Sequence, residues 1–302
     1  MKANTQAVIY AGAAVISWST IATALKVALK YQTHFEMLLI ASSTALLFFL
    51  MIVTVQKKWS KVNQLSGKQW RTFAGIGLLN PVAYYLILFK AYDLLPAQIA
   101  QPLNYTWPIV LLILLAAFAH QPIPPRKYIG MFISLGGIVL ITMSSGQGGK
   151  NASAVGIALA LSSAILWASY WLINNRQRKV DTSVALLITF LFGTVYLILA
   201  ASIIGIHSYS LSGLLSSMYV GCFEIAIPFI FFGLAMRKTT NPALINQMCY
   251  FSPFLSLLFI TLVLGEQIVF TTYLGLILIV GGIIFNQYCV KVVCRKEIIP
   301  KS

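Results

Sequence analysis

The sequence predicts an all-α membrane protein with ten transmembrane helices, arranged as two inverted five-helix repeats with both termini in the cytoplasm. Three observations lead to this prediction. Hydrophobic residues make up 59% of the 302-residue chain and charged residues only 9%, with a mean hydropathy of +0.86, whereas soluble domains are about 25% charged. Apolar stretches of membrane-spanning length recur along the chain. Its two halves also resemble each other.

Ten apolar stretches are each about 20 residues long, which is enough for a helix to cross about 30 Å of hydrocarbon. They begin near Ala7, Met37, Thr72, Ala97, Tyr128, Ser153, Thr182, Leu211, Pro242 and Ile268. Periodicity does not separate a spanning helix from a buried one, so the length and number of the stretches decide the prediction. The stretches are continuous rather than alternating, and barrel strands need only about 10 residues, which excludes a membrane β-barrel.

The positive charge of the chain lies mostly on one side of these spans. The formal net charge is +15, with 21 Lys and Arg residues. If the N-terminus is cytoplasmic, the basic residues on or near the outer side are Lys26, Lys30, Lys90 and Lys150. This asymmetry is the positive-inside pattern, and it predicts cytoplasmic termini in the inner or plasma membrane of the cell. We expect the basic clusters to contact anionic lipid and not nucleic acid.

The two halves of the chain repeat each other at a nearly constant offset. The matched positions are Tyr105 with Tyr250, Pro108 with Pro253, Gly130 with Gly275, and Gly136–Gly137 with Gly281–Gly282. Each half holds five spans, an odd number, so the second half must enter the membrane from the opposite side. We therefore expect two inverted repeats, residues 1–150 and 151–302, an architecture suited to alternating access around a cargo near the midplane. A duplicated helix bundle that transports nothing is the alternative.

Several features together carry a family resemblance. Besides the plan of two repeats, they are “LGE” (Leu264–Glu266) at the end of the ninth span, the paired glycines of the tenth, and “AYDLLPAQIAQPLNYTWP” (Ala91–Pro108). The chain resembles the EamA-type branch of the drug/metabolite transporter superfamily over essentially its whole length. The resemblance implies a secondary carrier that moves amino acids, other metabolites or drugs without ATP. The first half departs from the family pattern at His120–Gln121, where such repeats usually read Gly-Glu.

A lone carboxylate, Glu224, lies near the middle of the eighth predicted span. A charge at that depth costs roughly 2.5–3.5 kcal/mol on insertion scales, so it should face a cavity or a partner, or carry a proton. Asn80 occupies the equivalent place in the third span. We expect Glu224 to bind a proton or the ammonium group of the cargo, and Asn80 to hydrogen-bond the cargo. The alternative is a structural hydrogen bond, or an ion pair of Glu224 with Lys26 or Lys90.

The fourth and ninth spans carry polar side chains at matching helical spacings, so each set shares one face of its helix. The two sets are Gln98, Gln101, Tyr105 and Pro108 in the fourth span, and Asn246, Tyr250 and Pro253 in the ninth. Glutamine in lipid is costly, so these faces are expected to point into the bundle and to line the cargo site. Polar contacts between packed helices explain the same residues almost equally well.

Aromatic residues of three spans are expected to form walls of the cargo site. The candidates are the rings of Trp18, Tyr84, Tyr85, Trp167 and Tyr170, together with the neighbouring hydroxyl of Thr23. Aromatic rings can enclose an apolar or cationic part of a cargo. The alternative for each ring is the interfacial belt of the membrane or packing against neighbouring helices.

Charged residues are expected at the outer mouth, where they would gate or attract cargo, or form a solvated rim. They are Lys26, Glu36, Lys90, Asp93 and Glu266. No catalytic or cofactor motif accompanies them: the chain lacks HExxH, GxSxG, a dinucleotide fingerprint and a complete phosphate loop. We expect no enzyme activity, no cofactor and no metal site.

These observations predict a carrier that moves a small organic metabolite by alternating access, with an amino acid or amine-bearing compound as the expected cargo. Its expected partners are this small molecule, the lipid bilayer and, as a candidate coupling ion, the proton. A carrier for nucleotide sugars or phosphate esters and a passive channel are the alternatives. The sequence is compatible with a homodimer.

Overall fold

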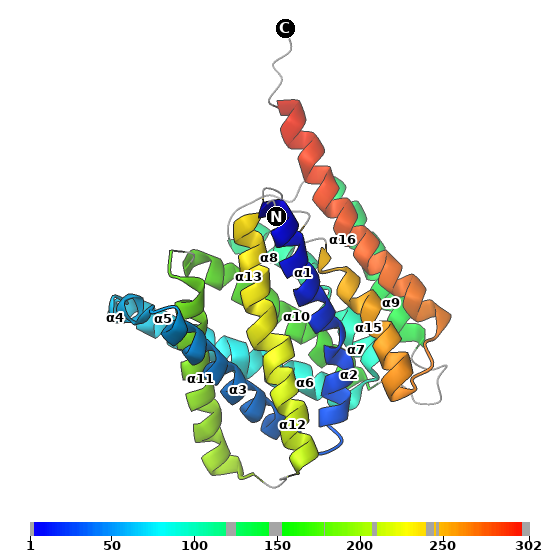
Figure 1. The fold of residues 1–302 in the computed structure, drawn as a ribbon. Coiled ribbons are helices and arrows are strands. Elements are labelled where there is room, and N and C mark those ends of the chain that lie inside the picture. The colour runs from blue at the N-terminus through cyan, green and yellow to red at the C-terminus, as the bar shows by residue number, and fades with distance from the viewer. Residues whose placement is uncertain are drawn as a thin grey trace.

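A computed structural model shows the chain as a set of helices joined by short connections (Figure 1). The structure describes residues 3–118, 125–144, 153–177, 179–206, 210–239, 245 and 248–297. Every regular element assigned within these residues is a helix, which confirms the predicted all-α class.

The elements fall into two halves of similar composition. The first half contains α1 (Ala3–Ser19), α2 (Ile21–Ala28), α3 (His34–Val55), α4 (Trp59–Asn63), α5 (Gly67–Gly77), η1 (Leu78–Ala83), α6 (Tyr84–Leu94), α7 (Ala97–Asn104), α8 (Trp107–Phe118) and α9 (Pro125–Ser144). The second half contains α10 (Ala154–Asn174), η2 (Asn175–Gln177), α11 (Thr182–Ile204), α12 (Leu211–Val220), η3 (Gly221–Ala226), α13 (Ile227–Lys238), α15 (Phe251–Phe259), η4 (Ile260–Leu264) and α16 (Phe270–Glu297).

Seven helical stretches in the described residues are long and apolar enough to cross a membrane. They are Asn4–Ala28, His34–Val55, Gly67–Leu94, Ala97–Phe118, Ala154–Asn174, Thr182–Ile204 and Leu211–Lys238. Shorter apolar stretches cover Phe251–Leu264 and Phe270–Asn286, and α9 lies at the predicted fifth span. The start predicted near Pro242 lies outside the described residues. The protein is a multi-pass membrane protein, as predicted.

Several of these stretches are interrupted, and two interruptions occupy equivalent places in the two halves. The wide π-helical turn η1 separates α5 from α6, and η3 separates α12 from α13. At η1, Asn80 has non-helical angles (φ −144°, ψ 117°), and the next residue, Pro81, has no N–H to donate. Irregular backbone at membrane depth is tolerated only where protein or a cavity covers it. The turn η1 therefore belongs to the interior of the bundle, and η3 likewise buries Gly221, Ile225 and Ala226.

Local sequence signals explain where several helices begin. Thr33 and Glu36 form a capping box at the start of α3, and Ser66 and Gln69 form one at the start of α5. Glu36 is only 2% exposed, and its carboxylate accepts hydrogen bonds from the Thr33 amide and hydroxyl at 2.9 Å each. Glu36 was one of the charges expected at the outer mouth. The structure instead shows it as part of a helix cap, in which side-chain oxygens accept the amides at the start of a helix that have no partner within it.

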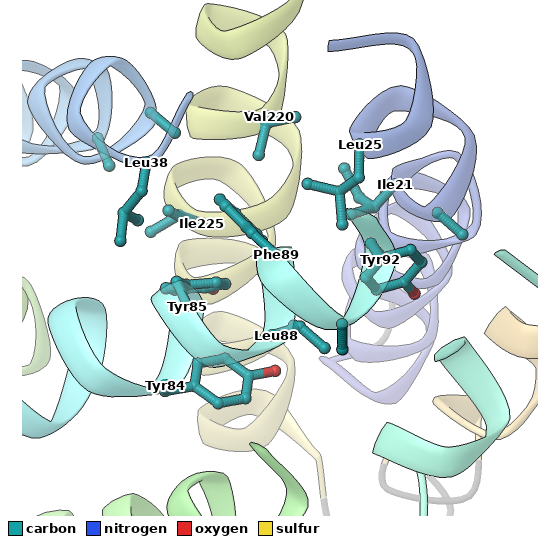
Figure 2. Packing of buried hydrophobic residues seen from close by; sticks show 14 of the residues in the cluster. Ile21, Leu25, Leu38, Tyr84, Tyr85, Leu88, Phe89, Tyr92, Val220 and Ile225 are labelled. Carbon is teal, nitrogen blue, oxygen red and sulfur yellow. The ribbon is translucent and has the colours of Figure 1, made fainter. Parts of the chain in front are cut away.

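The buried core gathers where α6 meets α3, α2 and the α12–η3 segment. Figure 2 shows Tyr85 and Phe89 of α6 beside Leu38 of α3 and beside Val220 and Ile225 of the second half. Large buried side chains from both halves thus meet around α6. This arrangement places the first turn of α6 between the two halves of the chain.

Helices α9 and α16 lie side by side, with glycines at the contact (Figure 1). A Cβ atom on Gly137 would overlap the carbonyl oxygen of Gly275, and one on Gly275 would overlap that of Gly137. Gly130 and Gly282 make the same reciprocal contact. Each pair joins residues of the two halves, as expected for related repeats whose backbones approach closely at small residues.

An ionic contact joins the two halves at one end of the bundle. The Asp181 carboxylate, which caps α11, accepts hydrogen bonds from Lys58 Nζ at 2.9 Å and from Lys61 Nζ at 3.3 Å. Partial burial acts to raise the pKa of the Asp181 carboxyl. The hydrogen bond and charge of Lys58, with the bonds from Lys61 and the Ser183 amide, outweigh burial and hold this pKa below its usual value.

The first prediction concerns the glycine contact. Gly137→Ala is expected to lower the free energy of unfolding by about 1–3 kcal/mol, the usual range for overpacking, because its Cβ would press on the α16 backbone. Gly136→Ala is the matched control, since a Cβ there would meet nothing within 4 Å. Thermal unfolding of the purified protein in detergent measures both. Equal midpoints for the two variants would contradict the contact.

The second prediction concerns Asp181. Asp181→Asn keeps a capping side chain but removes the charge, so we expect a loss of no more than about 1 kcal/mol at neutral pH for this partly exposed pair. Because the folded pKa is depressed, the stabilisation is present above the unfolded value of about 3.9 and is lost as the pH falls through the folded value. Thermal unfolding across a pH series should therefore show that the difference in stability between wild type and Asp181→Asn becomes smaller in acid.

Asp93→Asn serves as the control for Asp181→Asn. Asp93 pairs with Lys90 at 2.6 Å, but both side chains are 39% exposed, so water screens this pair more strongly. We therefore expect Asp93→Asn to cost less stability than Asp181→Asn, and a larger loss from Asp93→Asn would contradict this expectation.

Candidate functional site

Glu224 lies in the wide turn η3, near the middle of the apolar stretch Leu211–Lys238, as predicted. Its carboxylate oxygen Oε1 accepts a hydrogen bond from the Tyr85 hydroxyl of α6 at 3.4 Å. Its main-chain oxygen accepts a hydrogen bond from the Trp18 indole of α1 at 3.1 Å. Ser17 donates to the neighbouring Phe223 carbonyl at 2.7 Å. Two helices of the first half therefore hold this turn of the second half.

The expected alternative of an ion pair for Glu224 is not what the structure shows. Lys26 Nζ donates to the Tyr92 carbonyl oxygen at 2.7 Å, and Lys90 pairs with Asp93. Among the described residues, Tyr85 is the one side chain that hydrogen-bonds the Glu224 carboxylate. The carboxylate at mid-span thus has a phenol for its partner, which is the structural hydrogen bond that the sequence offered as an alternative to cargo binding.

Asn80 lies in η1, the turn equivalent to η3 in the first half. Its side chain is fully buried, and both its amide nitrogen and its amide oxygen lack a hydrogen-bond partner among the described residues. The Tyr170 phenol of α10 lies close to Asn80 without forming a hydrogen bond of acceptable geometry. A buried polar group without a partner costs about 1–3 kcal/mol. The side chain therefore offers an unfilled donor and an unfilled acceptor.

Aromatic rings from three helices connect these two turns. The Tyr84 ring of α6 stacks on Trp167 of α10 at 4.7 Å between centroids, and Trp167 stacks on Tyr170 at 5.2 Å. Phe229 of α13 lies 5.9 Å from Trp167. The predicted candidates Tyr84, Trp167 and Tyr170 are thus brought together into one wall. Trp18 makes different contacts: its indole donates to the main-chain oxygen of Glu224, and its ring centroid lies 5.7 Å from that of Phe232.

The polar face of the fourth predicted span makes contacts with neighbouring helices. Gln98 donates to the Gln267 carbonyl at 3.1 Å, and Gln101 accepts a hydrogen bond from Ser256 of α15. Asn104 donates to Ser163 of α10 at 2.9 Å. These bonds satisfy the side chains within the bundle. The geometry of Gln98 and Gln101 therefore favours the packing alternative that the sequence left open.

The remaining candidates are placed less closely around the two turns. Thr23 is 6% exposed, and its hydroxyl has no partner among the described residues. Tyr105 lies beside Ser252 at the junction of α7 and α8 with α15. Tyr250, at the start of α15, is 6% exposed. Asn246 lies outside the described residues.

Charged residues expected at the outer mouth gather at the ends of α2, α6 and η4. Apart from Glu36, they line two adjacent cavities of 270 and 460 Å³ that share Leu29, Lys30 and Asp93. Glu266 of the “LGE” segment faces the first cavity and accepts hydrogen bonds from the amides of Ala97 at 3.2 Å and Gln98 at 3.4 Å. It therefore caps α7, since a helix N-terminus attracts a carboxylate.

Phe229, at the centre, was not among the residues singled out from the sequence, whereas Tyr85 was named beside Tyr84 as a candidate for the aromatic wall. Periodicity on one helix does not show which ring reaches the other half. The repeat offset was the sequence signal that pointed to this centre, because it places Asn80 and Glu224 at equivalent positions of the two halves. Among the described residues, no group of three His, Cys, Asp or Glu side chains could hold a metal ion.

Comparison with known proteins gives the same architecture. The chain matches the EamA-like transporter family over residues 5–143 and again over residues 154–287. A solved crystal structure of another protein superposes with a TM-score of 0.68 at 20% identity, over 96% of this chain and 99% of that one. This likeness shows that the fold has been observed before.

Curated relatives are named as transporters whose cargo is not stated. The uncharacterized transporter YvbV of Bacillus subtilis (strain 168) is 23% identical over 278 residues, covering 89% of this chain and 87% of that protein. YdfC of the same organism is 27% identical over 215 residues, covering 70% and 69%. An uncharacterized transporter of Clostridium kluyveri is 27% identical over 52% of this chain, which spans about half (53%) of that relative. Because the family match covers most of its length in two successive segments, the chain belongs to the EamA-like transporter family.

Proposed function

We propose that the protein is a secondary carrier of the cell membrane that moves a small organic metabolite, an amino acid or amine-bearing compound, by alternating access. In this proposal ten spans form two inverted repeats around a site near the midplane, with both termini in the cytoplasm. The family and the names of the relatives point to transport and not to catalysis.

The distribution of charge supports the proposed orientation. Lys238, at the end of α13, donates to Gln6 near the N-terminus at 2.9 Å, and Arg237 donates to Thr182 at 2.7 Å. These residues and the Lys58–Asp181 pair lie at the ends of spans that the positive-inside rule assigns to the cytoplasm. Lys30 and Lys90 line cavities at the ends assigned to the outside.

The observation that carries the proposal is the position of Glu224. A carboxylate at mid-span is expensive, and here it hydrogen-bonds a neutral phenol instead of pairing with Lys or Arg. A proton or a cargo ammonium group would neutralise it. Asn80, with its unfilled amide in the equivalent turn, would hydrogen-bond the other end of the cargo. The stacked rings of Tyr84, Trp167 and Tyr170 would enclose the cargo between these two groups.

The interrupted helices supply a route to alternating access. The turns η1 and η3 lie at the cargo-binding residues, so a change in cargo contacts acts directly on the points where α5 meets α6 and α12 meets α13. Wide helical turns recur at functional sites for this reason. We propose that the α6 and α13 segments tilt about these turns while the α9–α16 pair, packed through glycines, stays fixed.

The two alternative functions, transport of phosphate-bearing cargo and passive conduction, would require other features. Nucleotide sugars and phosphate esters would require Lys or Arg at cavity depth, but Lys26 and Lys90 bond to the Tyr92 carbonyl and to Asp93 at the outer ends of the helices. A passive channel would conduct without saturation. Saturable flux that is stimulated by cargo on the opposite side would distinguish a carrier from a channel.

The third prediction tests Glu224. In proteoliposomes, Glu224→Gln is expected to remove the pH dependence of cargo flux and to reduce the rate by about tenfold or more, the equivalent of one lost charge-assisted hydrogen bond. The cargo is chosen beforehand by a thermal-shift screen of amino acids, polyamines and nucleotide sugars. Asp93→Asn is the control, because it also replaces a carboxylate by an amide, but at the outer end. Undiminished, pH-dependent flux in Glu224→Gln would remove this residue from the mechanism.

The fourth prediction separates binding from packing at Asn80. Asn80→Leu keeps a similar volume and removes an unpartnered amide, so the thermal midpoint should be unchanged or higher, while the KM for cargo rises by about tenfold. Asn104→Leu is the control. Asn104 accepts from Tyr84 at 3.4 Å and donates to Ser163, so its loss should lower the midpoint. A destabilised Asn80→Leu protein with normal KM would show that Asn80 is structural.

A further inference from the structure

Tyr85 forms the side-chain link between the interrupted helices of the two halves. It lies in the first turn of α6, directly after η1, and is fully buried. Its hydroxyl lies 3.4 Å from Glu224 Oε1 in η3. Figure 2 shows the Tyr85 ring beside Ile225, the residue that follows Glu224. A hydrogen bond therefore joins α6, one of the segments proposed to tilt, to the turn η3 of the other half.

The chemistry of this bond depends on the state of Glu224. A phenol donates its proton to an ionised carboxylate in a charge-assisted hydrogen bond, which is roughly twice as strong as a neutral one. A protonated carboxyl, or one already bound to an ammonium group, is a weaker acceptor. The bond is thus strongest when Glu224 is empty and charged.

The other titratable groups around Glu224 do not replace Tyr85. The phenols of Tyr84, Tyr92 and Tyr105 lie near enough to interact with its charge, but Tyr84 donates to Asn104. Cys222, two residues before Glu224 in η3, forms no hydrogen bond with its carboxylate in the described part of the chain. The elements packed against η3 carry further titratable groups, and none of these hydrogen-bonds that carboxylate either. These are Tyr10 on α1, His34 and Glu36 at the start of α3, Tyr219 on α12 bonded to Thr20, the Lys90–Asp93 pair on α6, and Arg237 and Lys238 at the end of α13.

We propose that Tyr85 is a positioning residue that holds the charged Glu224 carboxylate toward the first half of the chain and favours its ionised form until a proton or cargo ammonium displaces it. This inference rests on the proposed function of Glu224. Release of the bond would free the two interrupted helices to move relative to each other, so occupation of Glu224 would be coupled to the change of access.

Tyr85→Phe tests this inference, because it removes one hydroxyl and keeps the ring. Flux in proteoliposomes is measured across a pH series for wild type, Tyr85→Phe and the control Tyr196→Phe, which loses a hydroxyl on α11 that donates to the Ala74 carbonyl at 3.3 Å. We expect the pH midpoint of flux to move up by about one unit in Tyr85→Phe, since the ionised carboxylate loses a donor, and to stay in place in Tyr196→Phe. Equal midpoints in all three proteins would overturn the inference.

A second readout does not depend on transport. The thermal midpoint of each purified protein is followed across the same pH series. Ionisation of Glu224 should change this midpoint over a certain pH range, and Tyr85→Phe should move that range by the same amount as the pH midpoint of flux. In a Glu224→Gln background, Tyr85→Phe should cause no further shift. If Glu224→Gln leaves the pH dependence of flux intact, the proposed function fails. If the pH range of this thermal change depends on Glu224 but not on Tyr85, the positioning role alone fails.

Discussion

Polar groups at membrane depth must find partners inside the bundle, and this requirement organises the structure. Water is absent from hydrocarbon, so each buried amide, hydroxyl or carboxylate either bonds another protein group or awaits a ligand. Most polar side chains here meet the requirement between helices, as Asn104 does with Ser163. Glu224 and Asn80 depart from this pattern at the two equivalent turns: one is a carboxylate held by a phenol, and the other is an amide without a partner among the described residues. A few other buried groups, such as the Thr23 hydroxyl, also lack a partner there.

The same requirement explains why the wide turns occur where they do. A turn such as η1 or η3 leaves main-chain groups outside the regular helical pattern, and lipid cannot satisfy them. Packing of α3, α6 and α11 around these turns covers the backbone, while the close approach of α9 to α16 through glycines forms a second, more regular contact. The close glycine contact and the wide turns at the centre are complementary, because the proposed alternating access would require both a fixed frame and places where helices can bend.

The two repeats place chemically different side chains at equivalent positions of the proposed site. Equivalent positions in the two halves carry Asn80 and Glu224, so one half offers a neutral amide and the other an ionisable group. The family pattern also diverges at the ends of the repeats. Glu266 caps α7 through two main-chain amides, whereas the corresponding Gln121 lies outside the described residues. A duplicated frame thus allows each copy to specialise without altering the fold.

By itself, the sequence determined the helical class, the two-repeat plan and the depth of Glu224 and Asn80, because apolar length, charge asymmetry and repeat offset act along the chain. It also predicted that Tyr84, Trp167 and Tyr170 could form an aromatic wall, which the structure assembles. Only the tertiary structure decided which side chains cross between helices. Tyr85 reaches Glu224, Lys26 reaches a main-chain carbonyl, and Glu36 and Glu266 cap helices. These pairings depend on how helices rotate and tilt against one another, which periodicity within one span does not specify.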